Sequence, residues 1–100
     1  MENTNNKPYS ILLYYCYADI CNPEEYREQH HLFCVENNIR GRIIISDEGL
    51  NGTVSGLTAD CEKYMVYIQA DPRFAKTAFK IDTHETHAFA KIHVRYKPEI

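Results

Sequence analysis

Residues 43–56 of this 100-residue chain read IIISDEGLNGTVSG. An apolar run of three isoleucines comes first, and a second β-prone run, Thr53 to Gly56, comes last. Asn-Gly alone can close a two-residue hairpin, yet here two acids and another glycine stand before it. The stretch therefore predicts two strands joined by a loop longer than a hairpin requires, with glycines free to adopt positive φ.

This loop is a candidate binding element. Glycine N–H groups can turn together toward a bound anion, but the neighbouring acids repel a phosphate placed there. The acids could instead orient a basic group or a base edge. The alternative is a longer hairpin whose glycines only satisfy turn geometry. The residues of this loop motif are Glu48, Gly49, Asn51, Gly52 and Thr53.

Strand and helix patterns alternate around this stretch. The predicted elements are a strand over Tyr9–Tyr17, a helix from Pro23 to about Asn38, strands over Arg42–Ser46 and Thr53–Gly56, a helix capped by Thr58 and ended by Asp71-Pro72, a strand over Thr77–Asp82 and a terminal strand over residues 91–97. This βαββαβ order predicts a ferredoxin-like α+β fold. We expect an antiparallel sheet with two helices on one face and a C-terminal strand extension.

Side-chain periodicity assigns the faces of these elements. Apolar residues on both faces of the first strand indicate a central strand. Inward helix positions are Tyr26, His30, Phe33 and Cys34, then Cys61, Tyr64, Met65 and Ile68. Phe79 and Ile81 are expected to face inward from the fourth strand.

Composition predicts one soluble domain, with 44% apolar and 25% charged residues. No run approaches the roughly 20 apolar residues that a membrane helix needs, so no membrane partner is expected. Residues 1–8 are polar, which predicts a disordered lead-in without a secretory signal. The four cysteines contain no C-x-x-C pair. We therefore expect free thiols and a cytoplasmic location.

Basic residues gather near the end of the chain. Residues 73–97 hold six lysines and arginines against two acids, although the whole chain has a net charge of −3. Side chains two apart on a strand lie about 7 Å from each other, close to the spacing of successive phosphates on an extended nucleic acid. A ladder of this kind could follow an RNA backbone, or it could simply protect an edge strand from aggregation. The ladder consists of Lys91, His93, Arg95 and Lys97.

Tyrosines and histidines add weaker candidates. Tyr14 or Tyr15, together with Tyr17, could stack on bases from the helix-free face of the sheet. An RNA-recognition motif proper is disfavoured, because the third strand has no aromatic residue. His84, His87 and His93 lack a carboxylate or thiol that would complete a metal site. We expect no metal, no cofactor and no catalytic residue in this chain.

Several segments together resemble the bacterial rhodanese-related tRNA uridine hydroxylases, which use oxygen to make 5-hydroxyuridine at the wobble position. The similar segments are Gly41-Arg42-Ile43, the run from Glu48 to Gly56, Asp71-Pro72-Arg73-Phe74, Phe79-Lys80-Ile81, His87-Ala88-Phe89, His93-Val94-Arg95 and Glu99-Ile100. The resemblance implies that residues 9–100 are an acylphosphatase-like N-terminal domain. The rhodanese domain, which holds the catalytic cysteine, would be absent from this chain.

Three functions follow from this resemblance. In the favoured one, a non-catalytic domain contributes tRNA binding, with Lys91, Arg95 and Lys97 on phosphates. In the alternative, the domain docks the rhodanese domain of the same protein without touching RNA. A stand-alone acylphosphatase-type enzyme is less favoured, because no phosphate-binding arginine loop matches. Enzyme activity is expected of the longer parent protein rather than of this segment.

Overall fold

The computed structural model describes residues 7–98. These residues form β1 (Tyr9–Tyr17), α1 (Pro23–Glu36), β2 (Arg40–Ser46), β3 (Gly49–Leu57), α2 (Thr58–Gln69), the one-turn helix η1 (Pro72–Phe74), β4 (Lys80–His84) and β5 (Ile92–Tyr96). Most of the predicted lead-in over residues 1–8 lies outside the described residues. Pro8, which is described, accepts a hydrogen bond from the N–H of Thr58 at 3.0 Å.

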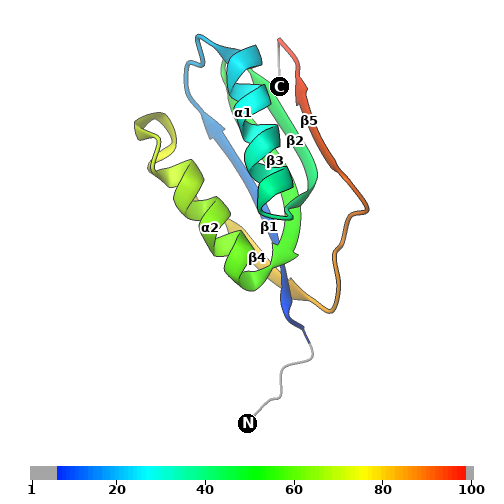
Figure 1. Cartoon of the computed structure of the whole chain (residues 1–100). Helices are drawn as coiled ribbons and strands as arrows, with labels where there is room; N and C mark the ends of the chain where they lie inside the picture. Colours follow the sequence, from blue (N-terminus) through cyan, green and yellow to red (C-terminus); the bar gives the residue numbers. More distant parts are fainter. Residues whose placement is uncertain (1–6, 99–100) are drawn as a thin grey trace.

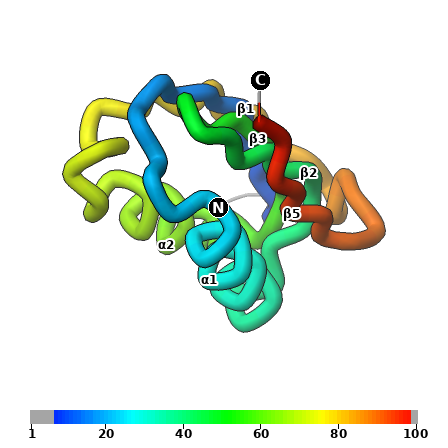
Figure 2. Tube along the Cα trace, turned by 90° about the horizontal axis from the view of Figure 1, so that it is seen from above, coloured from blue at the N-terminus to red at the C-terminus, as the bar shows by residue number. Residues whose placement is uncertain are grey.

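The five strands form one sheet in the order β4-β1-β3-β2-β5. Both helices cover the same face of this sheet, and the other face carries no helix (Figures 1 and 2). The first four strands pair antiparallel, as the ferredoxin-like prediction requires. β5, the predicted C-terminal strand extension, joins the edge of β2 in parallel, a pairing that the sequence did not specify. The ferredoxin-like α+β fold is thus confirmed, and the extension makes the five-stranded sheet a mixed one.

The connection from β4 to β5 explains this parallel pairing. The two strands lie at opposite edges of the sheet, so residues 85–91 must cross from one edge to the other. His87 is held on the way: its Nδ1 lies 3.0 Å from Ser55 Oγ, and its ring contacts Tyr9. The crossing uses the helix-free face and delivers β5 beside β2 in the same direction as β2.

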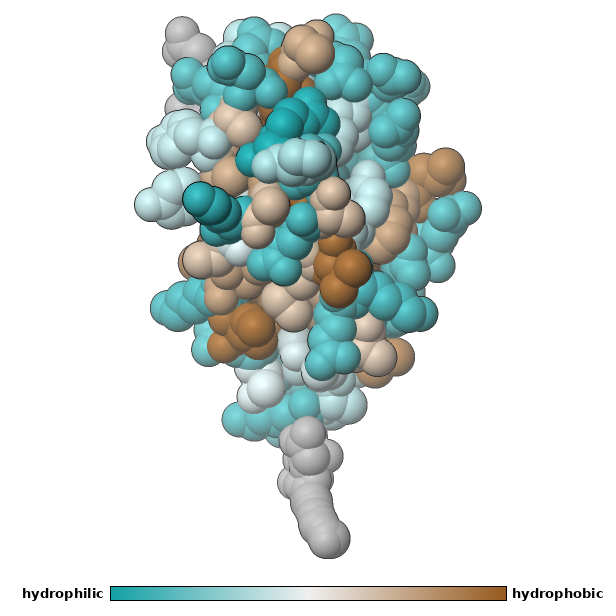
Figure 3. Space-filling view, turned by 90° about the vertical axis from the view of Figure 1, so that its left-hand side faces the viewer, coloured by the Kyte–Doolittle hydropathy of each residue, from teal (hydrophilic) through white to brown (hydrophobic). Residues whose placement is uncertain are grey.

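The core lies between the helices and one face of the sheet. The predicted inward residues of both helices are confirmed, with Tyr26, Cys34, Tyr64 and Ile68 buried. Burying an aliphatic side chain such as that of Ile68 stabilises the fold by roughly 1.5–3 kcal/mol. The outer sides of the helices and the helix-free face of the sheet carry some exposed apolar side chains. On the side viewed in Figure 3, apolar groups form separate patches among hydrophilic ones.

The hairpin between β2 and β3 is much tighter than the sequence suggests. Its turn consists of Asp47 and Glu48 alone, because Ser46 already pairs with Gly49. Residues 49–52 belong to β3, where they pair with β1 on one side and β2 on the other. Two neighbouring strands therefore satisfy the backbone groups of a segment that by itself looks like a loop. The long-loop prediction was wrong.

Other element boundaries also differ from the predicted ones. β4 starts at Lys80 rather than Thr77, because Thr77 folds back and donates its hydroxyl to the Phe74 carbonyl at 2.8 Å. Phe79 packs against the core as expected, but Ile81 is 52% exposed at the edge of the sheet. Thr58 is the first residue of α2 rather than its cap, and Leu57 takes the N-cap position.

No helix within residues 7–98 is long and apolar enough to span a membrane. Two of the four cysteines, Cys34 and Cys61, are buried under the helices. Burial raises the pKa of Cys34 to about 12 and that of Cys61 to about 11. Both therefore stay protonated and unreactive at neutral pH.

Candidate nucleic-acid interface

The predicted basic ladder lies on the helix-free face, at the edge of the sheet that β5 forms. His93 and Arg95 are exposed strand residues, and Lys97 follows directly after the strand. The backbone N–H of Lys97 donates to Ile45 at 2.9 Å, which fixes this end of the strand to β2. Lys91 precedes β5 and lines a different hollow, near Cys34 and Asn38. Three of the four ladder residues are therefore brought together, and Lys91 stands apart.

Arg42 completes this group, although the sequence reasoning did not select it. It lies on β2 directly opposite His93 in the parallel register. Together with His93, Arg95 and Lys97, it lines a shallow groove of about 320 Å³. The alternation of charged Arg40 and Arg42 with Gly41 and Ile43 is the sequence signal that could have revealed it. We call Arg42, His93, Arg95 and Lys97 the cationic groove.

A second feature of the same face is aromatic. Tyr15 is 70% exposed and Tyr17 is 69% exposed, and both project from the central strand β1. Tyr14 points the other way, into the core, so the open choice between Tyr14 and Tyr15 is settled in favour of Tyr15. Asn51 on β3 lies opposite Tyr15 in the register. The open face thus offers two accessible rings beside an amide, on the neighbouring strands β1 and β3.

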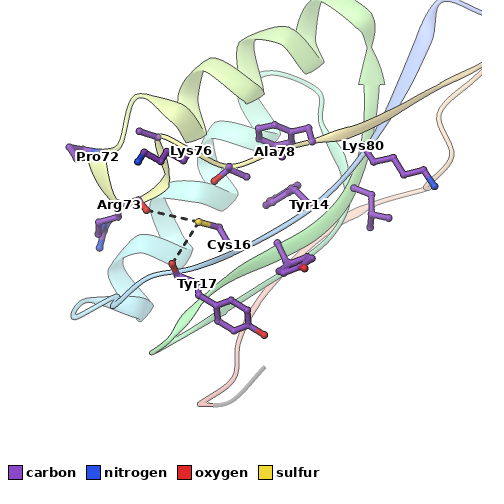
Figure 4. A pocket seen from close by; sticks show the side chains of 13 residues that line it. Tyr14, Cys16, Tyr17, Pro72, Arg73, Lys76, Ala78 and Lys80 are labelled. Carbon is purple, nitrogen blue, oxygen red and sulfur yellow. Dashed lines mark hydrogen bonds between the residues drawn. The ribbon is translucent and has the colours of Figure 1, made fainter.

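A cleft continues from these rings around the edge of β1. β4 pairs with β1 only as far as Leu13, which leaves the edge of residues 14–17 without a strand partner among the described residues. The cleft encloses about 860 Å³. Residues 72–80 lie along one side of it and β1 along the other (Figure 4). Lys76 and Lys80 line it, as does Arg73, which is already paired with Asp71 at 2.8 Å.

The residues of the loop motif belong to the hairpin turn and to the paired strand β3. The carbonyl of Glu48 accepts a hydrogen bond from Ala18 N–H at 3.1 Å, and Asp47 Oδ1 accepts one from the Tyr96 hydroxyl at 2.9 Å. Gly49 is a paired strand residue. Neither Gly49 nor Gly52 has positive φ, so the two glycines do not form the anion nest that was considered for them. Asn51 and Thr53 are paired as well, and the alternation along β3 places both side chains on the open face.

Gly52 is a glycine because of packing rather than turn geometry. A Cβ at this position would lie 2.9 Å from the Tyr14 hydroxyl and 3.1 Å from the Arg42 carbonyl oxygen. The missing side chain lets the Tyr14 ring lie directly on β3.

The histidines considered for metal binding do not converge. His87 Nδ1 contacts Ser55 Oγ, and His84 Nδ1 lies 2.8 Å from the Thr86 carbonyl oxygen. His93 belongs to the cationic groove on the far edge of the sheet. Within residues 7–98, no group of three histidine, cysteine or carboxylate side chains could hold a metal ion.

A mixed five-stranded sheet with both helices on one face defines an acylphosphatase-like α+β domain. Residues 9–100 match the family model described as the UPF0176 acylphosphatase like domain, and the chain belongs to this family. It is 61% identical over 94 residues to a tRNA uridine(34) hydroxylase of Cytophaga hutchinsonii, which covers 94% of this chain and 30% of the relative. It is 51% identical, with the same coverages, to the tRNA uridine(34) hydroxylase of Bacillus mycoides. The resemblance to tRNA uridine hydroxylases is confirmed.

Solved structures support the fold alone. The dark-state structure of the BLUF protein BlrB superposes with a TM-score of 0.75 and 15% identity, covering 92% of this chain and 74% of that one. At that identity the likeness carries no functional argument. The chain spans about 30% of the length of the curated relatives that it matches.

Proposed function

We propose that this chain is the N-terminal domain of a tRNA uridine(34) hydroxylase and that it contributes tRNA binding through the helix-free face of its sheet. The names of the relatives supply the substrate class, and the cationic groove supplies the contact chemistry. This places the protein in the cytoplasm, where tRNA is modified. The rest of such an enzyme, expected to include a rhodanese domain, would carry out the hydroxylation.

The cationic groove is the observation that carries this proposal. Its four side chains come from two neighbouring strands and are all accessible. Asp82, on the opposite edge strand, is the one carboxylate at a strand position of this face within residues 7–98. This face therefore attracts a polyanion, although the whole chain has a net charge of −3.

A salt-dependent binding measurement tests the proposal. The affinity of an unmodified tRNA transcript for the chain is measured by fluorescence anisotropy at several salt concentrations. We expect Arg95→Glu to weaken binding and to reduce the slope of log K against log salt by roughly 1. The matched control is Lys63→Glu, which makes the same charge change on α2, on the helix side of the sheet. Equal affinity and equal slope in the two variants would exclude the groove as an RNA contact.

A second candidate function, docking of the remaining part of a longer protein, has its own supporting observation. Leu32, Val35 and Val66 are exposed apolar residues on the outer side of the helices. The relatives have more than twice as much chain beyond this domain as within it, and that chain needs a surface to pack on. The helix layer offers such a surface, and it lies opposite the cationic groove.

A further inference from the structure

Packing in the core does not explain why β1 carries two exposed tyrosines. Tyr15 and Tyr17 leave about 70% of their surface in solvent, on the part of β1 that extends beyond the pairing with β4. Their rings touch edge to face, with centroids 6.0 Å apart. Leu13 continues the apolar strip on the same side of β1. A strip of this kind adds little to folding stability, since most of its area remains in water.

Positive charge flanks this strip on both sides. The strand register places Tyr15, Asn51, Ile44 and Arg95 in one row across the sheet. Three strand spacings separate Tyr15 from Arg95, which is about 14 Å. Lys76 and Lys80 line the cleft on the other side of β1, and neither forms an ion pair with a carboxylate within residues 7–98. Lys80 lies opposite Leu13 on β4, so the order across the face is cation, ring, cation, with Lys76 further along the cleft.

We propose that Tyr15 and Tyr17 stack on the bases of an unpaired RNA segment whose backbone runs from the cationic groove across β1 to Lys76 and Lys80. This inference rests on the proposed function and specifies which part of an RNA the face takes. Aromatic side chains stack on bases whose faces are free, whereas duplex bases already stack on each other. Asn51 lies beside Tyr15, where its amide can hydrogen-bond a base edge.

Charge decides between RNA and a protein segment as the occupant. An apolar strip alone would also suit a peptide. Cations on both flanks complement the regular negative charge of a nucleic-acid backbone, and rings between them are the arrangement that single-strand binding surfaces use. Asp82, the one carboxylate at a strand position of this face within residues 7–98, lies beside Ile11, away from Tyr15 and Tyr17.

Substitution of the rings tests the inference on this chain. The probe is a single-stranded oligouridylate of about ten nucleotides, within the site size of comparable surfaces. We expect the double substitution Tyr15→Leu/Tyr17→Leu to weaken its binding by about five-fold or more for each ring lost. The control Tyr15→Phe/Tyr17→Phe keeps both rings and should bind like the wild type. Thermal melting of each variant checks that the fold is intact.

Two further measurements separate this inference from the proposed function. A duplex RNA of the same length should bind the wild type and the leucine variant equally, because it contacts only the cations. NMR spectra should show upfield shifts of the Tyr15 and Tyr17 ring protons with the oligouridylate. If the chain binds tRNA through Arg95 but the leucine variant keeps full affinity for the oligouridylate, the stacking inference alone is overturned. If no RNA binds the wild type, the proposed function fails as well.

Discussion

At the scale of single residues, the most consequential group in the core is His30. It projects inward from α1 with no exposed surface, and its Nε2 is 2.6 Å from the Tyr64 hydroxyl. Tyr64 is hydrogen-bonded in turn to Tyr14 of β1. This chain of hydrogen bonds links both helices to the sheet inside an otherwise apolar core. Desolvation by burial lowers the pKa of His30 from 6.5 to about 3.

That pKa makes stability depend on pH. Between about 3 and 6.5 the unfolded chain protonates His30 while the folded chain does not, so the free energy of unfolding falls as pH falls. From pH 7 to pH 5 we expect a loss of about 2 kcal/mol from this residue. Urea unfolding at the two pH values measures it. His30→Gln removes the titration, so its stability should change less over the same range. His87, whose pKa burial also lowers, is common to both proteins. Identical pH slopes would contradict the assignment.

Residue patterns in the sequence could predict that His30 is buried, but they could not predict its hydrogen-bond partner. Helical spacing alone placed His30 and Tyr64 on the inward faces of their helices. The hydrogen bond between them required knowing how the two helices lie on the sheet. Likewise, alternation along Tyr9–Tyr17 predicted two faces but not which one the helices cover. The choice between Tyr14 and Tyr15 as the exposed ring beside Tyr17 therefore became evident only from the structure.

At the scale of elements, the crossing of residues 85–91 determines where the cationic groove forms. Ser55 holds this crossing: it contacts His87 Nδ1 and accepts a hydrogen bond from Ala88 N–H at 3.2 Å. The crossing ends beside β2, where Gly41 N–H donates to the Lys91 carbonyl at 2.9 Å. β5 then extends next to Arg42, which completes the groove.

Removing the Ser55 hydroxyl should loosen β5 specifically. We expect Ser55→Ala to cost about 1–2 kcal/mol, because two hydrogen bonds at a buried site are lost. Hydrogen exchange should become faster at the amides of Gly41 and Lys97, which bond across the β2–β5 region. Ser10→Ala is the matched control, a buried serine whose hydroxyl instead contacts Thr58 at 3.0 Å. Unchanged exchange in the Ser55 variant would mean that the crossing does not hold the strand.

Element order was predictable from local patterns, whereas the pairing of the last strand was not. The βαββαβ order follows from caps, periodicity and turn residues, each of which is local. The partner of β5 depends on the path of a link that has no regular structure. The hairpin turn was misjudged for a related reason. Glycine and asparagine at residues 49–52 favour a loop locally, but two flanking strands hold them extended.

At the scale of the whole molecule, the two layers give the domain two surfaces of different character. The sheet presents the cationic groove and the tyrosines, and the helices present isolated apolar side chains. The net charge of −3 hides this division, because the acids lie mostly outside the open face. A domain built in this way can hold RNA on one side and another part of a protein on the other.

The division predicts which substitutions affect which partner. We expect this chain to associate with the separately expressed remainder of the Cytophaga hutchinsonii relative, with NMR shifts concentrated on α1 and α2. Val66 is 66% exposed on α2, and Val66→Asp should weaken the association by roughly ten-fold, because a buried valine contributes about 1.5 kcal/mol or more. Arg95→Glu should leave it unchanged while weakening tRNA binding. The opposite result, with Arg95→Glu disrupting association and Val66→Asp having no effect, would make the sheet face the docking surface and leave no open face for RNA.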